Sequence, residues 1–317
     1  MNILVTGAAG FIGSHLAERL VALGHTVRGV DSLTDYYARG LKELNIRDIQ
    51  RQGVTFMPLD LAQDDLSAAL RDVQIVYHLA AQPGLSATTT FETYVRNNIT
   101  ATHRLLEAAK ASPSFQGFLN ISTSSVYGYD ATGDETAEPK PTSFYGVTKL
   151  AGEQLVLAYA RDHGMPNSSL RLFSVYGPRE RPEKLYHGLI RSMFEDREFP
   201  IFEGSEEHVR SYTYVGDIVD GLVLALEHVD QCKGEIFNIG SDTAITTGEG
   251  IRLIEEIIGK PARLVRKPRR TGDQLKTHAN IDKARRVLGY HPTTSAREGL
   301  AAEVEWYRQQ VLGSFPS

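Results

Sequence analysis

Tyr145 and Lys149 lie four positions apart in the stretch SFYGVTKL (residues 143–150). Residues at this spacing share one face of a helix, with Cβ atoms about 5–6 Å apart. A phenol has a reference pKa near ~10, whereas a base acting at neutral pH works best near ~7, and a neighbouring cation favours phenolate. The pair therefore predicts a tyrosine base assisted by a lysine. The alternative is a surface phenol and a solvated ammonium that do no chemistry.

A glycine-rich turn near the N-terminus predicts a dinucleotide site. The stretch LVTGAAGFIGSHLAERL (residues 4–20) places Gly7, Gly10 and Gly13 between an expected strand and an expected helix. Glycines let backbone approach a pyrophosphate, and the helix N-terminus offers free N–H groups. Asp31 follows Gly13 by 18 residues (31 − 13) and matches an acid that binds a ribose diol, which favours NAD over NADP. The alternative is a turn that only joins strand to helix.

The composition excludes several classes of protein. The chain has 317 residues and a net charge of −5, which gives no electrostatic reason to expect nucleic acid or an anionic membrane as a partner. No apolar run approaches the roughly 20 residues of a membrane span, and the N-terminus lacks the basic region of a signal peptide. The single cysteine, Cys232, excludes an internal disulfide framework. We expect an inert thiol in a polar loop, no metal site and a cytoplasmic location.

Alternating strand and helix patterns must position these residues. Helices are expected at 11–23, 91–111 and 144–162, and strands at 2–7, 26–31, 54–60, 74–80, 117–122 and 168–173. The third helix has an apolar stripe that includes Val147, Leu150, Ala151, Leu155 and Ala158. Strands rich in Val, Ile, Leu and Phe are typical of buried parallel sheets. The sequence thus predicts an α/β fold, a Rossmann-type doubly wound parallel sheet.

The pattern changes after Phe173. Residues 174–210 are rich in Pro, Arg, Glu and Gly, and residues 212–240 again read strand, helix, strand. The tail has an expected helix at 247–258, a basic loop at 263–272 and a terminal helix near 295–311. We predict an NAD-binding domain at 1–173, to which 212–240 returns. Residues 174–211 and 241–317 would form a smaller, discontinuous α/β lobe that binds substrate.

The combined motifs give the chain a family resemblance over nearly its whole length. The glycine turn and Y-x-x-x-K accompany YHLAA (77–81), NN (97–98), ISTSSVYG (121–128), VYGPR (175–179) and RSYTYVGDIVDG (210–221). With them the chain resembles the extended short-chain dehydrogenase/reductases, the nucleotide-sugar epimerases and dehydratases. The resemblance implies that Thr123 shares a proton with the substrate oxygen. It also implies cofactor contacts from Phe11, Ile12, Ser32, Asp60, Leu61, Leu79, Ala80, Ala81, Asn98 and Ser122, besides the residues above.

The residues after Thr123 indicate the reaction. Dehydratases and decarboxylases of this family carry an acid there, whereas this chain has Ser124 and Ser125. Oxidation followed by re-reduction needs no further acid or base, so epimerisation at C4 is favoured. Tyr145 would take the hydroxyl proton while C4 gives hydride to NAD⁺, and the ketosugar would turn before the hydride returns.

A second segment indicates the sugar. SVYGPRERPEK (174–184) resembles the corresponding segment of UDP-glucuronate 4-epimerases. The resemblance implies that Thr123, Ser124, Ser125, Ser174 and Arg181 surround the uronate carboxylate. It further implies that the remaining substrate contacts come from Pro83, from Ile201 and Phe202 beside the pyrimidine, and from Arg210 and Arg270 at the diphosphate.

One departure keeps other substrates open. The group reads P-G-V-R where this chain reads PGLS, so Ser86 replaces an arginine that Arg181 or Arg179 would have to substitute. UDP-glucose 4-epimerase is therefore the alternative, and a non-catalytic NAD-binding redox sensor or a net oxidoreductase that releases NADH are alternatives of other classes. The resemblance also implies a homodimer formed through the helices at 91–111 and 144–162.

Overall fold

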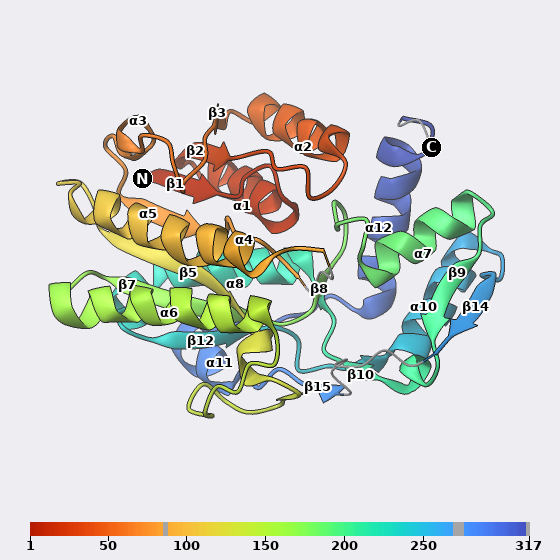
Figure 1. The fold of residues 1–317 in the computed structure, drawn as a ribbon. Helices are drawn as coiled ribbons and strands as arrows, with labels where there is room; N and C mark the ends of the chain where they lie inside the picture. The colour runs from red at the N-terminus through yellow and green to blue at the C-terminus, as the bar shows by residue number, and fades with distance from the viewer. Residues whose placement is uncertain (85–87, 269–275, 315–317) are drawn as a thin grey trace.

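The computed structural model describes residues 1–84, 88–268 and 276–314 (Figure 1). A parallel sheet of seven strands forms its centre, in the order β12-β7-β5-β4-β1-β2-β3. The strands are β1 (Asn2–Thr6), β2 (Thr26–Asp31), β3 (Thr55–Pro58), β4 (Ile75–His78), β5 (Gly117–Thr123), β7 (Asn167–Leu172) and β12 (Ile236–Ile239). Every strand expected for this sheet is present, and the predicted α/β fold is confirmed.

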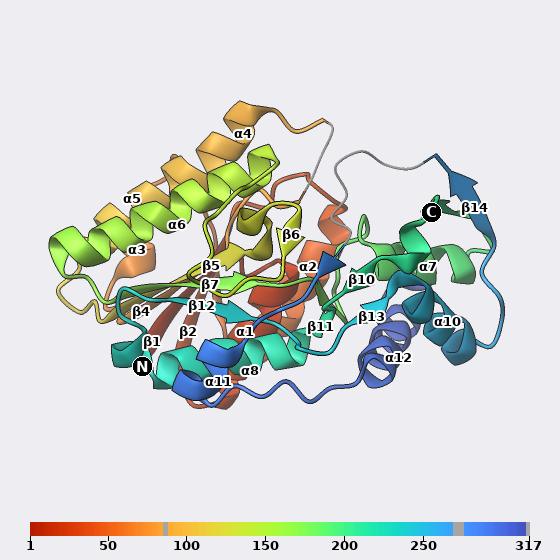
Figure 2. The same cartoon turned by 90° about the horizontal axis from the view of Figure 1, so that it is seen from below.

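Helices cover both faces of the sheet (Figure 2). The hydrophobic core on one face includes side chains of α1 (Phe11–Ala22) and α8 (Val215–Glu227), such as Leu16 and Leu222. The core on the other face includes side chains of α5 (Ala101–Lys110) and α6 (Phe144–His163), such as Leu105 and Val156. Apolar burial on both faces is what the continuous hydrophobic runs of the strands require.

Some local details differ from the predictions. Residues 91–110 are helical as expected, but α4 (Phe91–Val95) and α5 are joined by a π-helical turn at Arg96–Thr100. The helices α2 (Arg39–Arg51) and α3 (Ser67–Leu70) were not predicted, because much of α2 is polar and α3 is one turn long. Cys232 does not lie in an exposed polar loop: it is buried in α9 (Val229–Cys232), and burial raises the pKa of its thiol to about 12.

The expected apolar stripe of α6 is also wrong in part. Val147 is 44% exposed, whereas Lys149, Gly152 and Glu153 face the interior. Glu153 accepts two hydrogen bonds from Arg171 on β7, at 2.6 and 3.0 Å, and both side chains are buried. Lys149 and the Glu153–Arg171 ion pair occupy the inner face of the first half of α6. The periodicity of apolar residues could therefore not predict which face of this helix is buried.

A smaller lobe has its own core. It contains α7 (Leu185–Phe194), α10 (Thr247–Ile258) and α12 (Ala296–Trp306), and β9 (Phe199–Phe202) pairs with β14 (Leu264–Lys267). The expected basic loop at 263–272 is therefore partly a strand, and its residues from 269 onward lie outside the described part. Tyr186, Ile190, Ile254 and Leu300 are buried together.

The connections between the sheet and the lobe are short strands. β8 (Val175–Tyr176) pairs with β11 (Thr213–Tyr214), while β10 (Val209–Arg210) lies between β13 (Ile245–Thr246) and β15 (Lys276–Thr277), which also pairs with β6 (Asp130–Ala131). From the tail, α11 (Asp282–Leu288) packs against β12 and α8. In the described residues, no helix has both the length and the apolar character needed to cross a bilayer.

Candidate active site

The glycine turn forms a cradle at the end of β1. Gly7 has φ +71°, and a Cβ there would lie 2.9 Å from the amide nitrogen of Ala80. A Cβ at Gly13 would lie 2.2 Å from the carbonyl oxygen of Gly7. Helix α1 begins at Phe11 with no side-chain cap and no acid in its first turn, so its N–H groups and positive end remain available to an anion. This cradle fits a pyrophosphate.

Asp31 lies beside the cradle, at the end of β2, and Ser32 follows it on the exposed side. The Asp31 carboxylate accepts a hydrogen bond from the Leu33 amide at 2.9 Å. Burial raises the pKa of Asp31, while the charge of Lys42 opposes that shift. Lys42 is held by the Thr34 carbonyl at 2.6 Å. A carboxylate with remaining acceptor capacity fits a ribose diol.

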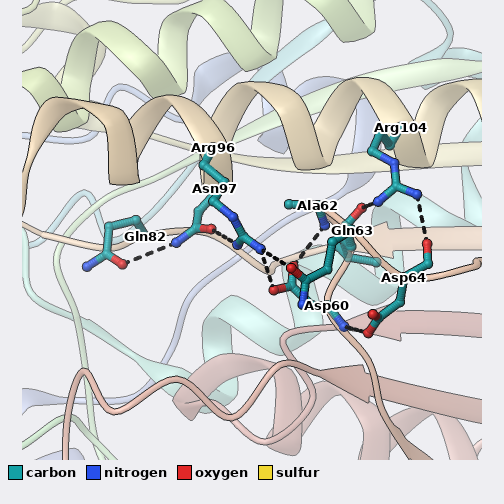
Figure 3. Close-up of polar contacts among 9 residues, drawn as sticks. Asp60, Ala62, Gln63, Asp64, Gln82, Arg96, Asn97 and Arg104 are labelled. Atoms are coloured by element: carbon teal, nitrogen blue, oxygen red, sulfur yellow. Dashed lines mark hydrogen bonds and ion pairs between the residues drawn. The ribbon is translucent and has the colours of Figure 1, made fainter.

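Asp60 is held by a network that the sequence did not predict (Figure 3). Its carboxylate accepts from Arg96 at 2.7 Å and from the Ala62 amide at 2.9 Å. Burial opposes ionisation, but these hydrogen bonds outweigh it and lower the pKa of Asp60. Arg104 donates to the carbonyl of the buried Leu61 at 3.0 Å. Arg96, in the π-helical turn that contains the NN motif, and Arg104, on α5, thus fix the loop whose Asp60 and Leu61 are expected to contact the cofactor.

The residues after β4 are fixed from two sides. Thr6 Oγ1 accepts a hydrogen bond from the amide of Ala80, which follows Leu79 and precedes Ala81, all partly buried. Asn98, in the π-helical turn, accepts from the Gln82 amide at 2.7 Å and donates to Thr148 Oγ1 at 3.0 Å. His78 lies between Thr6 and Thr102, and burial lowers its pKa to about 3. Asn98 and His78 thus fix the backbone at the end of β4 through their hydrogen bonds.

Three hydroxyl-bearing residues and Lys149 meet where β5 faces α6. The Lys149 Nζ donates to the Ile121 carbonyl at 2.5 Å, and burial lowers its pKa to about 8 while Glu153 opposes the shift. Thr123 Oγ1 donates to Ser125 Oγ at 3.3 Å. Ser122 Oγ is buried and has no hydrogen-bond partner among the residues described. An unpartnered hydroxyl beside a buried ammonium fits a bound ribose or nicotinamide.

Tyr145 stands in the first turn of α6, near Thr123. Burial raises the pKa of its phenol, and the Thr123 hydroxyl and the charge of Arg181 oppose that rise. The sequence assigned the lowering of this pKa to Lys149, which lies one helical turn further along α6 and whose ammonium donates to the Ile121 carbonyl. The structure adds a cation that the sequence did not link to the phenol, the guanidinium of Arg181.

Arg181 reaches this site from the loop before α7. Its guanidinium lies over the Tyr36 ring, 5.7 Å from the centroid, and forms an ion pair with Glu183 at 2.9 Å. A Cβ on Gly84, which follows the partly buried Pro83, would lie 3.6 Å from Nη2 of Arg181. Tyr36 was not predicted, since a tyrosine in a polar loop carries no motif. Arg181 is thus close to the segment in which an arginine is replaced by Ser86, which itself lies outside the described residues.

Arg179 does not share this position. It has φ +70° and forms ion pairs with Glu18 on α1 at 2.8 Å and with Asp48 on α2 at 3.3 Å. His15 Nε2 lies 2.8 Å from the Pro178 carbonyl oxygen, so the same helix also holds the preceding residue. Arg179 therefore anchors the loop to the large domain, whereas the charge of Arg181 acts on the Tyr145 phenol.

The remaining predicted substrate residues lie along the lobe. Ile201 is buried and Phe202 partly buried in β9, Ser174 is partly buried, and Arg210 lies in β10. Lys184, which the sequence did not single out, has a pKa lowered by burial and by the charges of Arg181 and, more weakly, Arg210. The charges of Arg181 and Arg210 thus both act on the ammonium of Lys184. Arg270 lies outside the described residues.

Similarity to known proteins agrees with this arrangement. Residues 3–240 match the NAD dependent epimerase/dehydratase family. The chain is 39% identical to the Bacillus subtilis protein named uncharacterized UDP-glucose epimerase YtcB, over 99% of this chain and 100% of that one. It is 34% identical to Arabidopsis thaliana UDP-glucuronate 4-epimerase 6, over 97% of this chain and 71% of that one.

A solved structure is similar over its full length. UDP-glucuronic acid 4-epimerase from Bacillus cereus, in complex with UDP-glucuronic acid and NAD, superposes with a TM-score of 0.92 and 41% identity, covering 98% of this chain and 99% of that one. A match to more than half of the chain, with the glycine cradle and the Tyr145–Lys149 pair in place, identifies the family. The chain belongs to the NAD dependent epimerase/dehydratase family.

Proposed function

We propose that the protein is an NAD-dependent UDP-sugar 4-epimerase that interconverts UDP-glucuronate and UDP-galacturonate. One observation carries the choice of a uronate: the Arg181 guanidinium lies beside Gly84 and over the Tyr36 ring, and its charge opposes the rise in the pKa of the Tyr145 phenol. A guanidinium is suited to bind a carboxylate through two hydrogen bonds. Relatives named UDP-glucuronate 4-epimerases support the same substrate.

The residues of the chain divide the chemistry between them. Bound NAD⁺ supplies a hydride acceptor for C4 of the sugar and returns the hydride to the opposite face of a transient 4-keto sugar. Tyr145 removes the proton from the C4 hydroxyl and later gives it back, and Thr123 hydrogen-bonds the same oxygen. Lys149, buried in the first half of α6, adds positive charge to the site and offers a donor to the cofactor ribose.

The serines after Thr123 favour epimerisation over elimination. Ser124 is buried and Ser125 is hydrogen-bonded to Thr123, and neither can remove a proton from C5. The 4-keto form of glucuronate is a β-keto acid and tends to lose CO₂. Hydroxyls and Arg181 that fix the carboxylate would keep its bond to C5 out of line with the carbonyl π system.

The direct test is turnover. Purified protein incubated with UDP-glucuronate should give UDP-galacturonate, detected by chromatography, with no accumulation of reduced nicotinamide absorbance. Absence of product from UDP-glucuronate and from every other UDP-hexose would refute the proposal. Accumulating NADH would instead indicate a net oxidoreductase.

A UDP-glucose 4-epimerase is the second candidate. The B. subtilis relative carries that name, and Ser86 replaces an arginine that the resemblance places at the sugar. Comparing kcat/KM for UDP-glucose and UDP-glucuronate on the same preparation decides between the two. A non-catalytic redox sensor is disfavoured because the catalytic pair is intact, and any turnover eliminates it.

We also propose a homodimer and a cytoplasmic location. Phe91, Phe144 and Val147 are 42%, 59% and 44% exposed on α4 and α6, where the resemblance places a subunit interface. The rings of Phe91 and Phe144 are 5.1 Å apart and form one apolar patch. Light scattering should give a molar mass twice that of one chain. The substitution Phe144→Glu should reduce the measured mass to that of one chain.

A further inference from the structure

The ion pair between Arg181 and Glu183 is incomplete. Arg181 Nη1 lies 2.9 Å from Glu183 Oε1, yet this buried nitrogen forms no hydrogen bond within the described part of the chain, so the contact with the carboxylate is poorly aligned. The two side chains are 15% and 41% exposed, so the cation is enclosed and its partner reaches toward solvent. A buried guanidinium nitrogen that lacks an acceptor can take a better-aligned one.

The neighbours of the Arg181 guanidinium are an aromatic ring and a glycine, which leave room for a ligand beside it. The Tyr36 ring covers one face of the guanidinium, and Gly84 places backbone without a side chain beside Nη2. The charge of Arg181 reaches the Tyr145 phenol. The same guanidinium therefore contacts the Glu183 carboxylate and acts on the phenol that would face the reacting sugar.

We infer that Glu183 is a specificity-determining residue: its carboxylate neutralises Arg181 in the free enzyme and is displaced by the carboxylate of a uronate substrate. This inference rests on the proposed function. Leaving Arg181 buried without any counter-charge would be costly, which gives the internal carboxylate a role before substrate binds. A neutral hexose would leave the pair intact, whereas a uronate must compete with it.

The expected effect is small because Glu183 is partly exposed. Ion pairs of this kind contribute little in water, which corresponds to roughly a 1.5- to 5-fold change in affinity. Glu183→Gln should raise the affinity for UDP-glucuronate by about that factor, since the neutral amide competes less well for the guanidinium. Affinity for UDP-glucose should stay unchanged, because that sugar carries no carboxylate.

The experiment uses the NAD-loaded full chain with Tyr145→Phe as the background, so that binding is measured without turnover. Isothermal titration gives Kd for UDP-glucuronate and UDP-glucose with and without Glu183→Gln. Glu43→Gln is the matched control, because Glu43 pairs with Arg39 at the same 2.9 Å on exposed α2. It should change neither affinity.

A double-mutant cycle isolates the pair. In an Arg181→Gln background, Glu183→Gln should have no effect on either Kd, and the selective gain should persist at 0.3 M salt. Equal gains for both sugars, no gain, or weaker uronate binding would each overturn the inference. If the background enzyme binds UDP-glucose but not UDP-glucuronate, the uronate assignment fails as well, which the UDP-glucose titration reveals separately.

Discussion

The two cations of the site are held in opposite ways. Lys149 belongs to the large domain, is buried on α6, and donates to a backbone carbonyl of the central sheet. Arg181 belongs to an irregular loop, is held by an ion pair and an aromatic ring, and its charge acts on the Tyr145 phenol. The first contact depends on parallel sheet and helix geometry that any member of the fold would share. The second depends on a loop whose length and residues can vary.

The difference indicates a division of labour. In the proposed function, Lys149 would serve the hydride and proton chemistry, which is the same for every sugar. Arg181, with its exchangeable partner Glu183, would be matched to one substituent on the sugar. Selectivity can therefore change without disturbing the base, provided that Arg179 keeps the loop anchored to α1 and α2.

Removing the base should give the largest effect. Tyr145→Phe deletes the phenolic oxygen, and general acid–base groups contribute about 10²- to 10⁴-fold to rates. We expect kcat to fall by at least that range while NAD remains bound, as measured by cofactor released on denaturation. Near-normal kcat would show that the rigid half of the site does not hold the base.

Removing the Arg181 charge should lower turnover of the uronate substrate far more than turnover of the neutral sugar. Arg181→Gln loses a charged hydrogen-bond donor, which is worth about 10- to 100-fold in binding. We expect kcat/KM for UDP-glucuronate to fall by that factor, with a much smaller change for UDP-glucose. Equal losses for both sugars would mean that Arg181 serves the base and not the carboxylate.

A smaller effect, on the pH dependence of stability, should come from the buried carboxyl pair Glu180 and Glu303. Glu180 and Glu303 are buried together, Glu303 accepts from the Gly177 amide at 3.1 Å, and burial raises the pKa of Glu180 to about 7. A raised carboxyl pKa stabilises the fold below the unfolded pKa of about 4.5 and loses that contribution as pH rises through about 7.

Glu180→Gln keeps a hydrogen-bonding side chain but does not titrate. Wild-type stability should decline between pH 5 and 8 by on the order of 2 kcal/mol more than that of the variant. Urea unfolding at both pH values measures this, with Glu43→Gln as a control on an exposed acid. Parallel pH profiles for wild type and Glu180→Gln would show that the pair does not share a proton.

Much of the large domain could be predicted from sequence, and for local reasons. Gly7, Gly10 and Gly13 precede a helix within a few residues, and Tyr145 and Lys149 share one helix turn. Strands of the central sheet are continuous apolar runs. Such signals need only neighbouring residues. The stripe on α6 failed because the pairing of Glu153 with Arg171 joins residues 18 positions apart.

The smaller lobe and the loop contacts could not be predicted in this way. The Asp60–Arg96 network and the Arg179 anchor join residues 36 and 161 positions apart. Nothing in local spacing links them. The sequence left open whether Arg179 or Arg181 would substitute for the missing arginine, and the structure pairs Arg179 with Glu18 on α1 and Asp48 on α2.

The sequence by itself determined the glycine turn before α1, the shared helix face of Tyr145 and Lys149, and the parallel sheet, because each rests on residues close together along the chain. Only the tertiary structure decided that the charge of Arg181 acts on the Tyr145 phenol, and what holds Arg181 in place. The physical reason is that charges act through space: burial and distance set their effect, and these depend on how the loop before α7 packs against the large domain.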